Sequence, residues 1–155
     1  MRVTQMAAGL TAAVTAVVGL NMATAGPAAA AEGSWRPYGN TNPITSSSSL
    51  WRCATTQTIA SDVLAQVCAV RASGGSGSGA QAAVIVRNNR SVLYRTSAEA
   101  SLWKGLERLG VWECASSGVG ANSWSVCFGR TLTQSGAVDA TGYVGGTSLG
   151  LSPTV

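Results

Sequence analysis

The sequence contains no histidine, so the candidate residues for catalysis or metal binding are its six carboxylates and four cysteines. Histidine is the commonest general base and a member of Ser-His-Asp and Cys-His sites, so those types of hydrolase are excluded. A glycosidase-type site would need two carboxylates that face one cleft. The carboxylates are scattered along the chain: Glu32, Asp62, Glu99, Glu107, Glu113 and Asp139. No pair stands out by its spacing, so the sequence favours a non-catalytic protein, with a small carboxylate-dependent hydrolase as an alternative.

The four cysteines lie in a pattern that occurs twice. Residues 50–56 read Leu-Trp-Arg-Cys-Ala-Thr-Thr and residues 67–71 read Val-Cys-Ala-Val-Arg; residues 111–117 and 126–130 repeat this as Val-Trp-Glu-Cys-Ala-Ser-Ser and Val-Cys-Phe-Gly-Arg. Four cysteines allow three pairings, and the repeat favours pairing within each copy, as Cys53–Cys68 and Cys114–Cys127. The absence of Cys-x-x-Cys spacing and of histidine argues against a metal site, and we expect no cofactor.

Each copy has two β-prone runs around a polar gap, which predicts a β-hairpin closed by its disulfide. If the cysteines face each other, Trp51 lies opposite Val70 and Trp112 lies opposite Gly129. Each tryptophan then shares a sheet face with the nearby cystine and belongs to the core. The predicted fold is therefore mainly β, with two duplicated hairpin units in a small sandwich or barrel.

The segments between the copies predict the remaining elements. Residues 82–94, with Asn88-Asn89 at their centre, predict another hairpin. A crossover helix is expected over about 98–109, because Ser97 can cap it, leucines recur at helical spacing and Gly110 can end it. Short closing strands are expected between residues 138 and 151. The predicted division is a flexible leader (32–49) and one β-rich domain (50–155), made of unit 1 (50–96), the helix region (97–110) and unit 2 (111–155).

Residues 1–31 have the character of a signal peptide, with Arg2, an apolar stretch from Met6 to Leu20 and an Ala29-x-Ala31 cleavage motif. We therefore expect secretion after cleavage near Ala31 into an oxidising compartment, and no integral membrane segment. Lys104 is the only lysine beside many arginines, a composition typical of GC-rich bacterial genomes. The formal net charge of +4 is spread along the chain and does not indicate nucleic-acid binding.

Three aromatic residues outside the expected core are candidate ligand contacts: Trp124, Trp35 and Tyr38. Aromatic rings beside small polar residues suit the faces and hydroxyl groups of sugars, so the first hypothesis is a secreted module that binds glycans or the cell wall. The second hypothesis is a protein-binding inhibitor of a secreted hydrolase. In that case the segment 115–126, held at both ends by a disulfide, would insert into the enzyme cleft.

Two resemblances bear on these hypotheses. The tandem disulfide-closed hairpins resemble the arrangement in cyanovirin-type lectins, and Cys53 to Cys68, with Thr56-Gln57 and Leu64-Ala65 between, is similar to their Cys…Cys segment. This resemblance implies glycan binding. It stops after Cys68, where the Asn-x-Asp-Gly signature of that family is missing. The general plan also resembles the small two-disulfide β proteins that soil bacteria export as protease inhibitors or ligand carriers.

Overall fold

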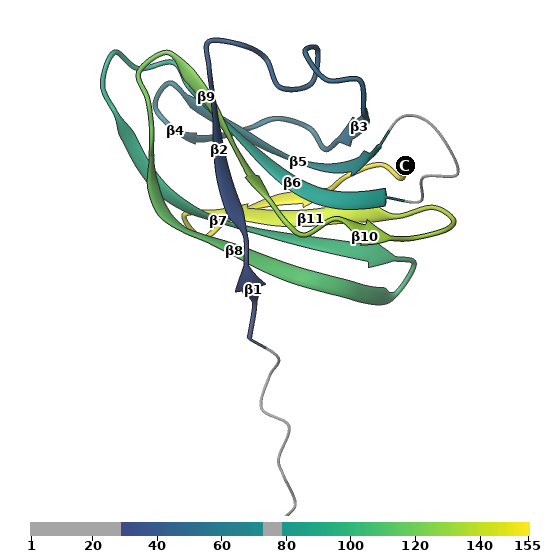
Figure 1. Ribbon diagram of the computed structural model, residues 1–155. Helices are drawn as coiled ribbons and strands as arrows, with labels where there is room; N and C mark the ends of the chain where they lie inside the picture. The colour runs from purple at the N-terminus through teal and green to yellow at the C-terminus, as the bar shows by residue number, and fades with distance from the viewer. Residues whose placement is uncertain (1–28, 73–78) are drawn as a thin grey trace, which may run out of the picture.

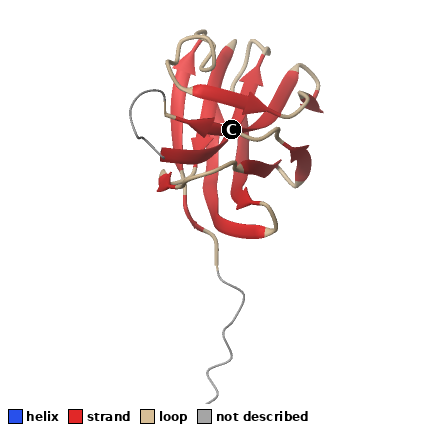
Figure 2. Cartoon of the chain, turned by 90° about the vertical axis from the view of Figure 1, so that its right-hand side faces the viewer, coloured by secondary structure: helices blue, strands red, loops and turns tan. Residues whose placement is uncertain are grey.

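The computed structural model describes residues 29–72 and 79–155, which form two β-sheets packed face to face (Figure 1). These residues contain strands and loops but no helix (Figure 2). The fold is therefore mainly β, as predicted, and of the two predicted forms it is a sandwich.

Sheet A has the strand order β1-β8-β7-β11-β12. Its strands are β1 (Ala31–Glu32), β7 (Tyr94–Lys104), β8 (Glu107–Val119), β11 (Asp139–Val144) and β12 (Thr147–Leu151). All neighbours are antiparallel except β1 and β8, which run parallel.

Sheet B has the strand order β2-β9-β6-β5-β3, with β4 also paired to β5 and β10 paired to β6. Its strands are β2 (Ser34–Gly39), β3 (Leu50–Cys53), β4 (Gln57–Ala60), β5 (Val63–Arg71), β6 (Gly79–Asn88), β9 (Ser123–Phe128) and β10 (Leu132–Thr133). All its pairings are antiparallel.

The main core lies between the sheets and is built mostly from valine and alanine. Alternate residues of β5 and β6 point inward, as the alternation of side chains in a strand requires. Larger side chains fill the space opposite, among them Leu102, Trp112 and Leu149, each at most 4% exposed. The core assignment of Trp112 is thus confirmed.

The helix predicted over about 98–109 is wrong: this segment forms the end of β7, a two-residue turn and the start of β8. Gly105 has φ +60° and is followed by Leu106, so the turn has the pattern favoured in tight hairpins. Leu106 is 100% exposed at the tip. The leucines recur at helical spacing, but the buried residues Ala98, Ala100 and Leu102 follow the two-residue period of a strand.

Both predicted disulfides are confirmed, but they join different kinds of elements. Cys53 and Cys68 lie directly opposite each other on β3 and β5 of sheet B. Cys114 on β8 and Cys127 on β9 connect sheet A to sheet B through the core. The predicted hairpin of the second copy is therefore wrong, because residues 120–122 carry the chain from one sheet to the other.

The predicted register holds for the first copy, where Trp51 pairs with Val70. Trp112 and Gly129 are not register partners, although a Cβ on Gly129 would lie 2.4 Å from the Trp112 ring. The hairpin predicted at Asn88-Asn89 is likewise a crossing between sheets, from β6 to β7. In sheet B, β9 of the second copy lies beside the contiguous strands β6, β5 and β3 of unit 1, and the duplication remains a prediction.

The segment 32–49, predicted as a flexible leader, begins with strands of both sheets. β1 pairs with β8 in sheet A, Gly33 passes beside Cys114, and β2 pairs with β9 at the edge of sheet B. The loop that follows lies over the outer face of sheet B (Figure 1). Most of the predicted signal peptide, residues 1–28, lies outside the described residues.

Candidate functional site

A second apolar cluster covers the outer face of sheet B, away from the main core. Its buried members are Cys68, Val70, Ala83, Ile85 and Val126. Partly buried residues pack against them: Tyr38, Ile44, Trp51, Cys53, Trp124 and Phe128. The outer face of this sheet is therefore apolar at its centre and partly open to solvent, unlike the usual polar face of an antiparallel sheet.

Trp51 occupies one side of this cluster. Its ring meets Phe128 edge to face, with centroids 6.0 Å apart, and it lies on the same face as the Cys53–Cys68 bond. The Trp51 Nε1 atom is buried and has no hydrogen-bond acceptor among the described residues. Trp51 thus has a packing role, as expected from the sequence, but on the outer face of the sheet.

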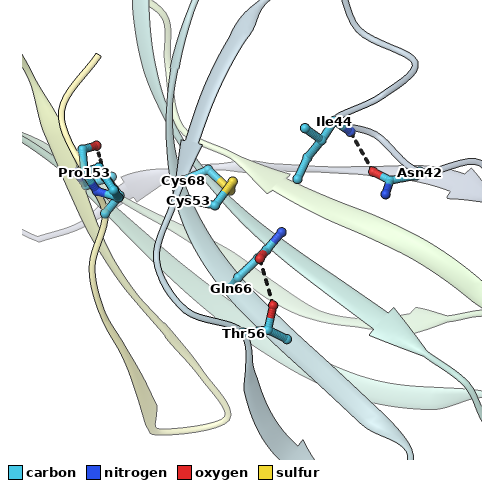
Figure 3. Close-up of a disulfide and its surroundings, with 9 residues drawn as sticks. Asn42, Ile44, Cys53, Thr56, Gln66, Cys68 and Pro153 are labelled. Atoms are coloured by element: carbon cyan, nitrogen blue, oxygen red, sulfur yellow. Dashed lines mark hydrogen bonds between the residues drawn. A yellow bond between two sulfur atoms is a disulfide. The ribbon is translucent and has the colours of Figure 1, made fainter.

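On the other side the cluster opens into a hollow of ≈ 100 Å³. It is lined by Thr56, Leu64, Ala65, Gln66, Ile85, Arg87 and Trp124. The Thr56 hydroxyl donates a 2.9 Å hydrogen bond to the Gln66 amide oxygen, beside the Cys53–Cys68 bond (Figure 3). The hollow therefore combines apolar and aromatic side chains with hydroxyl, amide and guanidinium groups.

Arg87 and Trp124 are direct cross-strand partners on β6 and β9. The guanidinium carbon of Arg87 lies 5.2 Å from the centroid of the Trp124 ring, within range of a cation–π interaction. Arg87 Nε donates to Asn89 Oδ1 at 2.7 Å, and one terminal nitrogen donates to Asn40 Oδ1 and Asn122 O at 3.0 and 2.8 Å. Arg87 is thus held by three neutral acceptors from three loops.

Asn88 supports this end of the sandwich from inside. Its side chain is fully buried, and its amide nitrogen donates to the carbonyl oxygens of Val92, Val119 and Gly120 at 2.8–3.0 Å. Its amide oxygen accepts from the Arg90 backbone nitrogen at 3.0 Å. Asn88 therefore ties together the two loops by which the chain changes sheets next to the hollow.

The structure separates the three predicted ligand-binding aromatics. Trp124 lines the hollow, and Tyr38 lies on the same face of sheet B, both partly buried. Trp35 packs against the main core, and its Nε1 donates to the Ala115 backbone oxygen at 2.8 Å. Only Trp124 and Tyr38 are therefore brought to one surface.

Sequence reasoning did not identify Arg87, Gln66, Thr56 or Leu64 as neighbours of Trp124. The pairing of β9 with β6, and of β6 with β5, brings these strands together, and it joins residues far apart in the chain. A local signal existed only on β5, where Leu64, Gln66 and Cys68 alternate with core residues and so must share the outer face.

The outer face of sheet A has a different character. Glu99 and Glu113 lie directly opposite each other on β7 and β8, and Tyr143 lies opposite Glu99 on β11. These side chains border a hollow of ≈ 320 Å³. Glu32 pairs with Glu113 on the other side, which makes a row of three carboxylates. No group of residues suited to holding a metal ion occurs in the part of the chain that the structure describes.

Comparison with protein families, curated proteins and solved structures found no match to this chain. Among residues 29–72 and 79–155 there is also no helix of the length and apolar character needed to span a membrane.

Proposed function

We propose that this protein is a secreted, non-catalytic module that binds glycans or cell-wall polysaccharide, with the Trp124 hollow on sheet B as its site. The observation that carries the proposal is a partly exposed tryptophan bordered by threonine, glutamine and arginine side chains. Two disulfides in a small protein are compatible with the extracellular location that such a role requires.

The chemistry of the hollow supports a sugar ring as ligand. An aromatic face can stack on the apolar face of a sugar, and neighbouring polar groups can bind its hydroxyls. In the described residues the amide nitrogen of Gln66 has no partner, while its amide oxygen already accepts from Thr56. A volume of ≈ 100 Å³ is below the range typical of enclosed small-molecule pockets, so the ligand would rest on the surface rather than enter it.

The test is calorimetric titration of the oxidised protein with cello-oligosaccharides, chito-oligosaccharides and soluble peptidoglycan fragments. We expect saturable binding to at least one of these glycans. Trp124→Ala should weaken that binding by at least about tenfold, because the stacking of a nucleobase, a ring of comparable area, on an aromatic side chain is worth about 1–3 kcal/mol.

The matched control is Trp103→Ala, because Trp103 is a tryptophan that also lies beside an arginine, Arg108, but on sheet A and outside the lining of the Glu99–Glu113 hollow. This variant should bind as the parent does. Equal loss in both variants would indicate a general effect on folding, and binding unaffected by Trp124→Ala would place the site elsewhere. Absence of binding across the panel would remove the proposal.

The hypothesis of a hydrolase inhibitor loses the segment on which it depended. Residues 115–119 belong to β8 and residues 123–126 belong to β9, so only residues 120–122 form a loop. A short connection of this kind does not provide the extended inserting loop that the hypothesis required.

A carboxylate-dependent hydrolase is a second candidate, favoured by the Glu99–Glu113 pair at the sheet A hollow. Cross-strand neighbours have Cβ atoms about 4.5–5.5 Å apart, a spacing that can bring two carboxylates to one bond. Incubating the same oligosaccharides with the protein and measuring new reducing ends tests this candidate. Activity abolished by Glu99→Gln would favour it over the binding module.

A further inference from the structure

We propose that the saccharide bound at the Trp124 hollow is anionic and that Arg87 binds its carboxylate or phosphate group. This inference rests on the proposed function and adds the chemical class of the ligand. It comes from the distribution of charge between the sheets and from the surroundings of Arg87.

The strands of the two sheets differ in charge. Five of the six carboxylates of the chain lie in strands of sheet A, where three basic residues accompany them. The strands of sheet B contain four arginines, Arg36, Arg52, Arg71 and Arg87, and no carboxylate. A negatively charged polymer is therefore attracted to sheet B and repelled by the row of carboxylates on sheet A.

Two of these arginines lie on the outer face that carries the hollow. Arg87 lines the hollow itself, and Arg36 borders a separate depression with Phe128. By contrast, Arg71 has a structural role, because its guanidinium group donates to the backbone oxygens of Gln134, Gly136 and Val155. The basic character of the ligand-facing surface thus centres on Arg87 and Arg36.

The charge of Arg87 is not neutralised within the described part of the protein. Its three acceptors, on Asn40, Asn89 and Asn122, are amide or carbonyl oxygens, and no carboxylate forms an ion pair with it there. Its second terminal nitrogen has no hydrogen-bond partner among the described residues. A guanidinium group that is fixed in position, with two free N–H groups beside an aromatic ring, suits an oxyanion attached to a stacked sugar.

The way in which Arg87 is held also favours an anionic ligand. The amide acceptors and the Trp124 ring hold the guanidinium group in place before any ligand arrives, so little side-chain entropy remains to be lost on binding. An arginine that served only to join the loops would satisfy the same three contacts, so the two roles must be separated by experiment.

The experiment compares three ligands of one backbone: cellohexaose, the same oligosaccharide oxidised to carboxylates at C6, and the same oligosaccharide phosphorylated at C6. Calorimetry at 50 and 500 mM NaCl should show that a charged form binds at least about tenfold more tightly than the neutral form at low salt. That advantage should shrink at high salt, whereas weak binding of the neutral form should not change. The preferred charged form identifies the source of the oxyanion.

Arg87→Gln should reduce affinity for the charged ligand to that for the neutral one. Arg108→Gln is the matched control, because Arg108 lies over Trp103 with its guanidinium carbon 5.7 Å from the ring centroid, but on sheet A. The control should leave all affinities unchanged. If Arg87→Gln fails to fold, the salt dependence of the unaltered protein still decides the question.

The outcomes separate the inference from the function on which it rests. Equal, salt-independent binding of neutral and charged ligands would overturn the anionic preference while supporting the glycan-binding module. Binding of none of the three, together with none in the earlier panel, would overturn both.

Discussion

Glu99 on β7 and Glu113 on β8 face each other directly across an antiparallel strand pair, and Glu113 is flanked on its other side by Glu32. Like charges in directly opposite positions of a sheet destabilise the folded state. Local conflicts of this kind concentrate at functional sites, which makes the pair worth testing for both stability and activity.

Replacing Glu113 with glutamine should stabilise the fold by roughly 0.2–1 kcal/mol, because it removes repulsion on both sides of this residue. Urea unfolding at low salt measures the free energy of unfolding, and the gain should shrink at 0.5 M salt. Glu107→Gln is the control. Because Glu107 lies opposite Lys104 on the same strand pair, this change should instead lower the free energy of unfolding slightly. Destabilisation by Glu113→Gln would show that the carboxylate has a favourable partner.

The turn between β7 and β8 allows a direct test of hairpin against helix. Gly105 has φ +60°, so Gly105→Ala should destabilise the protein by about 1–2 kcal/mol. Leu106 is fully exposed, and Leu106→Ala should change the stability by less than about 0.5 kcal/mol. A helix would give the opposite pattern, with Gly105→Ala stabilising and Leu106→Ala costly.

The two disulfides should differ in their rate of reduction. Cys114 and Cys127 are at most 1% exposed in the core, whereas Cys53 is partly exposed on the outer face of sheet B. Because thiol–disulfide exchange requires access, Cys53–Cys68 should be reduced first in the folded protein. Pulsed alkylation followed by mass spectrometry measures the order, and in denaturant the two bonds should react at similar rates. Prior reduction of Cys114–Cys127 under native conditions would contradict the burial of that bond.

Asp139 should make stability depend on pH. Desolvation by burial raises the pKa of Asp139 above the usual 3.8, so the folded state binds its proton more tightly than the unfolded state. The contribution of this group to stability therefore falls as the pH rises from below 3.8 through the raised pKa. Asp139→Asn should be more stable than the parent near neutral pH, and the difference should vanish in strong acid. Thermal unfolding of both proteins from strong acid to neutral pH measures this difference in stability. A difference that did not depend on pH would contradict the prediction.

The sequence was sufficient for features that depend on local pattern. The repeated Trp-x-Cys motifs predicted both disulfide pairings, and the pairing of Cys53 with Cys68 predicted the register of Trp51 with Val70. The β-rich class followed from composition and from the strand-like runs. Each of these inferences used residues close together in the chain or a motif present in both copies.

The errors arose where a long-range choice decides the structure. A hairpin and a crossing between sheets both consist of two strand-like runs with a polar connection, so the turns at Asn88-Asn89 and at 120–122 look alike from sequence. Leu102, Leu106 and Leu109 recur at helical spacing, but the residues of β7 that are buried in the core, Ala98, Ala100 and Leu102, alternate as in a strand. Trp124 was identified as a candidate contact, whereas Arg87 became its neighbour only through the pairing of β6 with β9.

Pro37, which by composition suggested a flexible leader, lies in β2 at the open edge of sheet B, next to the bulge between Pro37 and Gly39. Proline has no N–H to donate, and a bulge bends the strand, so this edge is a poor template for the strand of another molecule. Pro37→Val would restore the missing N–H at this edge, and we expect the variant to aggregate at concentrations where the parent stays dispersed, as light scattering can measure. The dispersal of concentrated protein would then depend on one exposed ring at the border of a sheet, outside the main core.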